Sequence, residues 1–477
     1  MSELRFKRRS GEVVGLAESE VDAFEADFHG QILRPDSERY DRCRQVWNGM
    51  HDRRPALIAC CAGSEDVVRA MELARDHELL VAVRGGGHSV AGHSTCDDGL
   101  VIDLTLMDGV DVDPDARTAR VQAGAHWAVV DGATQPFFLA APGGVVSTTG
   151  VAGLTLGGGY GWLRRKYGLS CDNLLSAEVV TVDGRQLTAG KTENADLFWG
   201  LQGGGGNFGI VTSFEFQLHP VGPEVLYVST LYPLESGAAV FRAWRDFMAA
   251  APDEVTSDAT IWTIPADPEM PSELHGRQIV LVEAVYAGGT EEGRRVMGPL
   301  QELSEPLLDL SGPVRYVDVQ RAFDEFVPPK EFQYYWKSIN LEDLRDDAID
   351  IILERGRERP SPRTLVPIRY LGGAISRVGT EETAFGDRSA RILVSIDSVW
   401  ADPAATEENI AWTRAFWQAL EPLSTGGAYL NFAGLGEDGE ALVSASYGKN
   451  YRRLVELKQK YDPENVLRLN QNIKPGG

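Results

Sequence analysis

The chain has few cysteines, and they follow no pattern typical of a disulfide framework or a metal site. Five cysteines occur in 477 residues, an odd number, and Cys60 and Cys61 are adjacent. A disulfide framework instead shows an even number of cysteines at regular spacings. No CxxC pair or HExxH motif occurs, so a structural or catalytic zinc site has little support. We therefore expect no metal site.

The sequence also lacks long apolar runs and an excess of positive charge. No segment approaches the roughly eighteen consecutive apolar residues of a membrane span. The first residues, MSELRFKRRSGEVVG, carry basic side chains without the apolar segment of a secretory signal behind them. The net charge of −24 repels a phosphate backbone. We expect a cytoplasmic protein that binds neither a membrane nor nucleic acid.

Glycine, by contrast, is abundant, and its distribution divides the chain. At 477 residues the chain is too long for a single ordinary hydrophobic core, so we expect more than one domain. Residues 55–220 are glycine-rich and alternate short apolar runs with a few helical stretches. Residues 223–428 carry long alternating segments between amphipathic helices, which favours half-buried strands in a mainly antiparallel sheet with helices on one face. GGAYLNF, residues 426–432, is predicted to form a further strand.

The stretch LLVAVRGGGHSVAGHS, residues 79–94, carries the clearest chemical signal. Its apolar run ends at Arg84 and at Gly85–Gly87, and His88 follows directly. Glycines let the backbone approach a ligand closely, and successive N–H groups in such a turn can form a site for a phosphate. The imidazole beside that site is a candidate base, ligand or nucleophile. The alternative is a plain turn with a hydrogen-bonded surface histidine.

Two further glycine clusters invite a nucleotide-binding interpretation. Gly204–Gly209 satisfies the GxGxxG pattern, but the Rossmann fingerprint requires a helix after the glycines. Here the β pattern IVTSFEFQL follows, so a glycine-rich loop lining a nucleotide in another fold stays open. Residues 141–173 combine many glycines with small hydroxyl side chains. Either tight packing of turns or a dinucleotide running beside residues 84–89 accounts for that composition.

Several of these motifs, in a fixed order, resemble one known family. The chain resembles the FAD-binding domain of the vanillyl-alcohol oxidase / p-cresol methylhydroxylase (PCMH-type) superfamily in RGGGHS, PGG…TTGVAG…GGGYG…RKYGLSCDNL and ENADLFWGLQGGGGNFGIVTSFEFQL. It resembles the berberine-bridge-enzyme-like branch in YLNF and YDPENVLRLNQNI. The resemblance covers roughly residues 50–220 and 425–475. It is far more specific than a single GxGxxG motif.

This resemblance implies an α+β fold with a bipartite FAD-binding domain. We expect residues 1–221 to form the FAD domain, with a core at about 53–221, and residues 222–429 to form a substrate-binding domain with an antiparallel sheet flanked by helices. Residues 430–477 are expected to complete the FAD domain. FAD is the implied cofactor, bound at the interface between the domains, a usual place for a ligand pocket.

The resemblance also implies a covalent link between the protein and the flavin. In that family the histidine of the RxGGH loop is bonded to the C8 methyl group of the flavin, and His88 matches it. Many members add a second bond from a cysteine, but the matching position here is Val146. The histidine that ends the same motif is replaced by Leu154. We therefore expect a single covalent link, through His88, and no cysteinyl link.

Further site residues follow by residue-wise match to the family. Predicted cofactor contacts besides His88 come from Arg84, Gly85, Gly86, Gly87, Ser89, Ser147, Thr148, Gly150, Gly153, Gly158, Asn173, Ile210 and Asn431. The tyrosine of the YxN motif often acts as the base, and it matches Tyr429. Side chains at i and i+2 of a strand share a face, so Tyr429 and Asn431 are expected side by side. A tyrosine needs a stabilised phenolate to act as a base, and the alternative is an aromatic core residue.

The implied activity is that of an FAD-dependent oxidoreductase. We expect an oxidase that transfers hydride from an alcohol, sugar or secondary-metabolite carbon to FAD and then passes the electrons to oxygen, giving hydrogen peroxide. The alternatives are a dehydrogenase of the same fold with another acceptor, and a flavin-binding protein without turnover. The substrate is expected to be a small molecule of unspecified identity. The sequence indicates nothing about oligomeric state.

Overall fold

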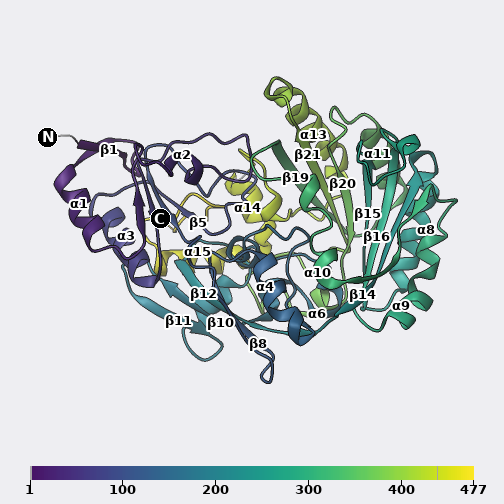
Figure 1. Ribbon diagram of the computed structural model, residues 1–477, viewed down its shortest axis with the longest axis horizontal. Helices are drawn as coiled ribbons and strands as arrows, with labels where there is room; N and C mark the ends of the chain where they lie inside the picture. The colour runs from purple at the N-terminus through teal and green to yellow at the C-terminus, as the bar shows by residue number, and fades with distance from the viewer. Residues whose placement is uncertain (1–2, 438, 477) are drawn as a thin grey trace.

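The computed structural model describes residues 3–437 and 439–476, which form two halves lying side by side (Figure 1). One half contains both ends of the chain, and the other contains a large sheet with helices along its outer side. We call them the first half and the sheet half. The combination of helices with separate, mainly antiparallel sheets confirms the predicted α+β class.

The first half is built on two sheets. The smaller has the strand order β3-β4-β6-β5, in which β4, β5 and β6 are parallel and β3 is antiparallel. The larger is antiparallel, with the order β11-β10-β12-β8-β7. The strands are β3 (Gln31–Leu33), β4 (Leu57–Cys60), β5 (Val81–Arg84), β6 (Leu100–Asp103), β7 (Val110–Asp113), β8 (Thr118–Gln122), β10 (Leu174–Val180), β11 (Gln186–Gly190) and β12 (Ile210–Gln217).

Short helices and small hairpins complete this half around a shared core. Every residue of β4 is buried, as expected for a parallel strand covered on both faces, and α3 packs its apolar side against the neighbouring β6. The helices are α1 (Glu18–Ala26), α2 (Tyr40–Cys43), α3 (Ser64–Asp76), α4 (Trp127–Thr134), α5 (Val151–Leu156), α6 (Arg164–Tyr167) and α7 (Ala195–Leu201). Two strand pairs are formed by β1 (Glu3–Lys7) with β2 (Val13–Ala17) and by β9 (Leu139–Ala140) with β13 (His219–Pro220).

The sheet half holds one antiparallel sheet with the order β17-β14-β16-β15-β20-β21-β19, and β18 also pairs with β14. Its strands are β14 (Glu224–Pro233), β15 (Val255–Thr263), β16 (Gln278–Tyr286), β17 (Leu308–Asp309), β18 (Gly312–Arg315), β19 (Gln333–Leu341), β20 (Val366–Tyr370) and β21 (Ile392–Trp400). Its helices are α8 (Gly237–Ala250), α9 (Thr290–Met297), α10 (Tyr316–Val319), α11 (Asp346–Arg357), α12 (Ala374–Arg377) and α13 (Thr406–Leu420). The predicted antiparallel sheet is thus confirmed.

The two faces of this sheet differ in chemistry. The outer face is apolar, with Ile261, Val282 and Val394 packed against helices such as α8, α11 and α13. The inner face turns toward the first half and carries charged side chains. The sequence predicted half-buried strands, but every residue of β15 and of β21 is buried. The reason is that the first half covers the face that was expected to meet solvent.

A buried ion pair fastens the two halves together. Arg164 of α6 belongs to the first half, yet its guanidinium is fully buried against the sheet. It donates to the Asp258 carboxylate and to the main-chain carbonyls of Ser257 and Tyr370. Ser257 and Asp258 belong to β15, and Tyr370 is the last residue of β20. The Arg164 side chain therefore holds the glycine-rich segment against the inner face of the sheet.

The end of the chain returns to the first half (Figure 1). Helix α14 (Glu440–Tyr447) leads to α15 (Tyr451–Tyr461), which packs beside α7. The prediction of a strand at GGAYLNF is wrong: only a single 3-10 turn, Leu430–Phe432, forms there. The backbone of Tyr429 is bonded to the side-chain hydroxyl of Ser338 in β19 instead of to the main chain of that strand.

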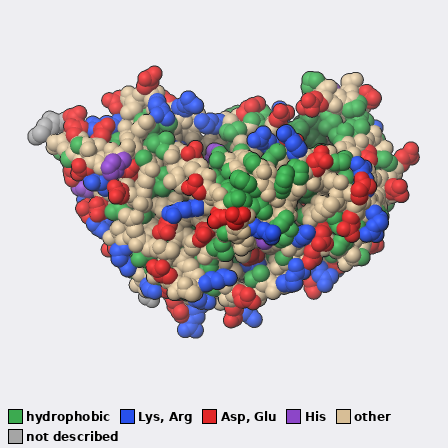
Figure 2. All heavy atoms as spheres, turned by 60° about the horizontal axis from the view of Figure 1, so that its bottom comes forward, with side chains coloured by type: hydrophobic (Ala, Val, Ile, Leu, Met, Phe, Trp, Pro, Cys, Tyr) green, Lys and Arg blue, Asp and Glu red, His purple; other side chains and the backbone are tan. Residues whose placement is uncertain are grey.

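Among the described residues, no helix is long and apolar enough to cross a bilayer. On the face drawn in Figure 2, acidic and basic side chains are interspersed, so the acidic excess of the chain is not gathered in one patch there. The predicted domain limits, 1–221, 222–429 and 430–477, remain predictions. They include residues 1–2, 438 and 477, which lie outside the described residues.

The buried cation of α15 gives a stability prediction. Lys458 is inaccessible to solvent and donates to the Asp462 carboxylate and to two main-chain carbonyls, those of Asn207 and Leu467. Lys458→Met leaves the Asp462 charge buried without its partner, so we expect the free energy of unfolding to fall by about 3–5 kcal/mol. Urea unfolding measures this loss. The control Lys460→Met removes only an exposed pair with Asp196 and is expected to change stability by less than about 1 kcal/mol; equal losses in the two variants would contradict the assignment.

Candidate active site

A cavity of about 320 Å³ lies between the two halves. The first half contributes the loop after β5, the glycine-rich segment before and within α5, the start of β12 and part of the C-terminal tail. The sheet half contributes the charged side chains of its inner face. Predicted site residues that line the cavity are Gly85, Gly86, Gly87, His88, Ser89, Gly150, Gly153, Ile210, Tyr429 and Asn431. The structure therefore brings together ten of the residues predicted for the site.

Two glycine loops meet main chain to main chain at the floor of this cavity. A Cβ atom built on Gly86 would lie 2.4 Å from the Cα atom of Gly150, and one built on Gly150 would lie 2.5 Å from the Gly86 nitrogen. No side chain fits at either position without moving the backbone apart. The next residue, Gly87, has a φ of +68°, which glycine adopts without strain. Gly86 and Gly150 are therefore required by this contact, and Gly87 by the turn that presents His88.

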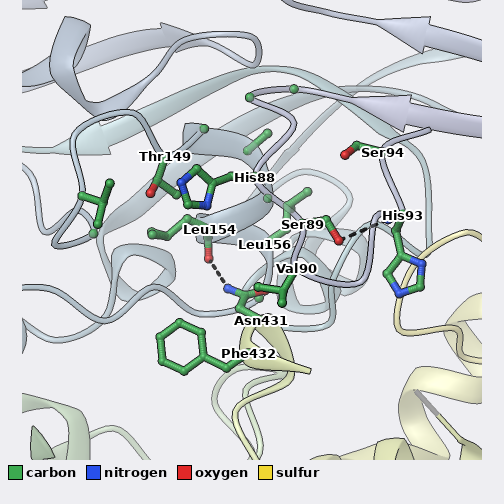
Figure 3. A pocket seen from close by; sticks show the side chains of 18 of the residues that line it. His88, Ser89, Val90, His93, Ser94, Thr149, Leu154, Leu156, Asn431 and Phe432 are labelled. Carbon is green, nitrogen blue, oxygen red and sulfur yellow. Dashed lines mark hydrogen bonds between the residues drawn. The ribbon is translucent and has the colours of Figure 1, made fainter. Parts of the chain in front are cut away.

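His88 is neutral and lacks a hydrogen-bond partner at Nε2. Burial lowers the pKa of its imidazole to about 3. The Nε2 atom is inaccessible to solvent and has no partner among the described residues. Buried polar atoms are normally hydrogen-bonded, so this nitrogen marks a place where a further group is accommodated. Its ring lies in the cavity near Thr149 and Leu154 (Figure 3).

Tyr429 and Asn431 approach the same cavity from the C-terminal segment. The Asn431 amide donates to the Leu154 carbonyl (Figure 3) and, over 2.8 Å, to the Tyr429 hydroxyl oxygen. The main-chain N–H of Gly159 donates to the same oxygen over 3.1 Å. Burial raises the pKa of Tyr429 to about 12, while these donors act in the opposite direction. The two side chains meet as predicted, but through a 3-10 turn and not through strand alternation.

Five predicted cofactor residues are not part of the cavity wall. Arg84 forms a buried ion pair with Asp103 over 2.5 Å, Ser147 is bonded to Asp324, and Asn173 donates to the main chain of Tyr167 and Leu169. Thr148 and Gly158 lie beside wall residues, namely Thr149 and Gly157, without lining the cavity themselves. The side chains of Arg84, Ser147 and Asn173 thus hold the loops that form the site.

The structure is compatible with a single covalent link. Val146 is in the wall of the cavity, at the position where the family carries its linking cysteine. Cys171 is fully buried, and its thiol lies near the Asp172 carboxylate. Burial raises the pKa of that thiol well above its usual value, which keeps it protonated. This is the environment of a structural cysteine.

Sequence reasoning missed the charged wall opposite the glycine loops. Glu283, Asp258 and Arg369 are register partners on β16, β15 and β20, and Asp397 of β21 lies on the same face. Burial raises the pKa of Glu283 to about 8 and that of Asp397 to about 6. The Arg369 Nη1 atom is buried without a partner among the described residues. The signal in the sequence was a single charged residue within each otherwise uncharged strand.

The wall as a whole suits a substrate that offers both donors and acceptors. Asp258 is engaged by Arg164, while Glu283 accepts a hydrogen bond from Tyr227 and Asp397 accepts one from Ser395. Trp336 lines the cavity and its indole nitrogen has no partner among the described residues. Apolar and aromatic side chains fill the space between these groups, as in most small-molecule sites.

Comparison with known proteins assigns the chain to a family. The family model described as FAD binding domain matches residues 55–190, and the model described as Berberine and berberine like matches residues 428–474. The uncharacterized FAD-linked oxidoreductase YgaK of Bacillus subtilis is 30% identical over 94% of this chain and 97% of that protein. The chain belongs to the family of FAD-linked oxidoreductases. The predicted relationship and the predicted cofactor, FAD, are confirmed at this level.

Two further relatives agree with this assignment. The (R)-6-hydroxynicotine oxidase of Paenarthrobacter nicotinovorans is 30% identical over 94% of this chain and 98% of that protein. The crystal structure of 6-hydroxy-D-nicotine oxidase from Arthrobacter nicotinovorans superposes with a TM-score of 0.84 at 27% identity, covering 94% of this chain and 99% of that one. An FAD-linked oxidoreductase is an enzyme, so the prediction of an enzyme is also confirmed.

The residues present fit FAD on the structure's own evidence. A main-chain cradle of glycines and an orphaned, neutral imidazole nitrogen meet in one cavity. Glycine-rich main chain that approaches a ligand closely is suited to the phosphates of a dinucleotide.

The glycine contact gives a binding prediction. Gly86→Ala places a Cβ atom against Gly150 and His126, so the two loops must separate and the bound FAD per protein is expected to fall at least severalfold. Absorbance of the purified protein measures flavin content. Gly132→Ala, in α4, meets no atom within 4 Å and serves as the control with wild-type content. Full flavin loading of Gly86→Ala would show that the close contact is not needed for binding.

Proposed function

We propose that the protein is an FAD-dependent oxidase with a single covalent link from His88 to the flavin. It oxidises an alcohol, sugar or secondary-metabolite carbon by hydride transfer to FAD, and dioxygen then accepts the electrons as hydrogen peroxide. The observation that carries the proposal is the unpartnered Nε2 of His88, in the same cavity as the Tyr429–Asn431 pair. The oxidases among the relatives support the same reaction class.

Covalent attachment suits the state of His88. An imidazole nitrogen is a nucleophile only when it is unprotonated, and burial keeps this ring neutral throughout the physiological pH range. Because Nε2 has no hydrogen-bond partner among the described residues, no protein contact has to break before it reacts. A permanently attached cofactor remains bound through repeated turnover.

Tyr429 is proposed as the group that takes a proton from the substrate. FAD supplies the hydride acceptor for this chemistry. The Tyr429 oxygen accepts hydrogen bonds from Gly159 and Asn431, and both bonds strengthen when the oxygen becomes negative. A neutral pair of donors thus performs the stabilisation that a neighbouring arginine or lysine would otherwise provide. The inner-face groups Arg369 and Asp397 are placed to orient the substrate from the opposite wall.

Acid precipitation tests the covalent link directly. The flavin of the wild type is expected to stay with the denatured pellet, and that of His88→Ala is expected to be released into the supernatant. Colour that washes out of the wild type would refute the link, and colour retained by His88→Ala would place it elsewhere. Peroxide formation in air by the same wild-type preparation separates an oxidase from a dehydrogenase with another acceptor.

Substitution of Tyr429 tests the proposed base. Tyr429→Phe is expected to slow flavin reduction by about 10²–10⁴-fold, the usual contribution of a positioned base, while flavin content stays unchanged. Anaerobic stopped-flow reduction provides the rate. Tyr232→Phe removes another buried hydroxyl, one that is bonded to the Leu300 carbonyl on the outer side of the sheet, and should leave the rate unchanged. A Tyr429→Phe enzyme with the wild-type rate would assign the tyrosine to the core alone.

A pH profile tests the role of Asn431. The Asn431 amide donates to the Tyr429 oxygen and lowers its pKa, so Asn431→Ala is expected to raise that pKa. A base must be deprotonated to act, and therefore the rising limb of kcat/KM against pH should move to higher pH. An unchanged profile, at unchanged flavin content, would mean that this hydrogen bond does not tune the base.

A further inference from the structure

The ring of His88 is part of an aromatic stack that crosses between the two halves. Trp47 lies against His88 with ring centroids 4.1 Å apart and an angle of 17° between the planes. The opposite face of Trp47 lies against Tyr334, at the start of β19, with centroids 3.8 Å apart and an angle of 25°. The indole is therefore sandwiched between the candidate attachment residue and the sheet half. Only 3% of Trp47 is exposed.

The polar atoms of Trp47 are bonded both to the loop that carries His88, residues 84–90, here called the attachment loop, and to the sheet half. Its main-chain N–H donates to the Gly87 carbonyl over 3.0 Å, directly before His88. Its carbonyl accepts from the Lys330 N–H over 2.7 Å, and its indole N–H donates to the Val327 carbonyl over 3.0 Å. One bond reaches the attachment loop and two reach the sheet half, so the position of the indole depends on both.

The neighbouring Asn48 extends this connection. Its side-chain amide donates to the Val90 carbonyl, two residues after His88, and to the Tyr334 carbonyl. Its side-chain oxygen accepts from the Tyr334 N–H. The fully buried Asn48 thus bonds the attachment loop to the start of strand β19. We call Trp47, Asn48 and Tyr334 the clamp.

The clamp limits the orientation of a ring whose Nε2 atom is not held by a hydrogen bond to the described residues. His88 follows three glycines, Gly85–Gly87, which have no side chains to pack against its ring. Rotation of the imidazole about its side-chain bonds is limited by the indole face on one side. An intramolecular reaction depends strongly on such alignment, and a small misplacement can slow it by about a hundredfold.

We propose that the clamp positions His88 for covalent attachment of FAD, so that the bond forms only when the sheet half has packed against the first half. Trp47 is a positioning residue in this proposal, because it acts through His88. The inference rests on the covalent link proposed above. It adds an order of events: the flavin binds, the halves close onto Trp47, and the bond then forms.

The step itself balances with dioxygen as the oxidant. An imidazole nitrogen of His88 forms a bond to the carbon of the flavin C8 methyl group, while the imidazole N–H and one methyl C–H bond break. The two hydrogens and their electrons pass to the flavin ring, and dioxygen then accepts them as hydrogen peroxide. Trp47 takes no part in the bond changes and affects only the geometry.

The test measures attachment separately from binding. Full-length Trp47→Leu and Trp47→Phe are incubated aerobically with excess FAD, and flavin is quantified over time both in the native protein and in the acid-precipitated pellet. We expect Trp47→Leu to bind FAD but to attach it about tenfold more slowly or worse. Trp47→Phe, which keeps an aromatic face, should recover most of the rate. Trp244→Leu, in α8 on the outer side of the sheet, controls for the loss of a buried tryptophan.

Tyr334→Leu and Asn48→Ala are the second pair of variants, in case Trp47→Leu does not fold. Tyr334→Leu removes the aromatic face on the sheet side of the indole, and Asn48→Ala removes the hydrogen bonds that join Val90 to Tyr334. Slower attachment is expected in both. Wild-type attachment rates in the foldable clamp variants would overturn the inference, as would an equal loss in Trp244→Leu. A wild type without acid-stable flavin would refute the covalent link itself, and the inference with it, so the two failures are distinguishable.

Discussion

The architecture depends on the fully buried guanidinium of Arg164. Arg164 belongs to the glycine-rich segment of the first half, and its guanidinium donates to the Asp258 carboxylate and to main-chain carbonyls of the opposing sheet. A buried charge is tolerated only where its bonds are satisfied, so this contact specifies one placement of the halves. That placement sets the inner face of the sheet opposite the two glycine loops and leaves the cavity between them. The candidate site exists because the two halves are held in this placement.

The two walls of the cavity have complementary tasks. The glycine wall brings bare main chain close to the cofactor and presents a neutral imidazole. The sheet wall presents carboxyl groups and an arginine in a buried setting, where burial raises the pKa of Glu283 and Asp397. Tyr429 joins these walls from a third segment near the end of the chain. Among the described residues, its oxygen accepts hydrogen bonds from two neutral donors, the main-chain N–H of Gly159 and the Asn431 amide.

The same closure that forms the cavity also completes the surroundings of His88. Trp47 and Asn48 precede the motif of the attachment loop by about forty residues in the chain, yet their partners Val327, Lys330 and Tyr334 all belong to the sheet half. In the proposed order of events, cofactor attachment and domain packing are coupled through this aromatic stack. Such coupling would ensure that the flavin becomes permanent only in a correctly assembled molecule.

Local motifs in the sequence located the glycine loops and His88 beside them, because each motif is a run of neighbouring residues, and the family resemblance carried by these motifs implied the α+β class and placed Val146 where a linking cysteine was sought. The strand at GGAYLNF was predicted wrongly, since periodicity does not show whether a partner strand is available. Only the tertiary structure decided that Arg84, Ser147 and Asn173 brace the loops, and that Asp258, Glu283, Arg369 and Asp397 converge on the cavity. The period of a strand predicts which side chains share a face, but what stands opposite that face is decided by packing between segments far apart in the chain.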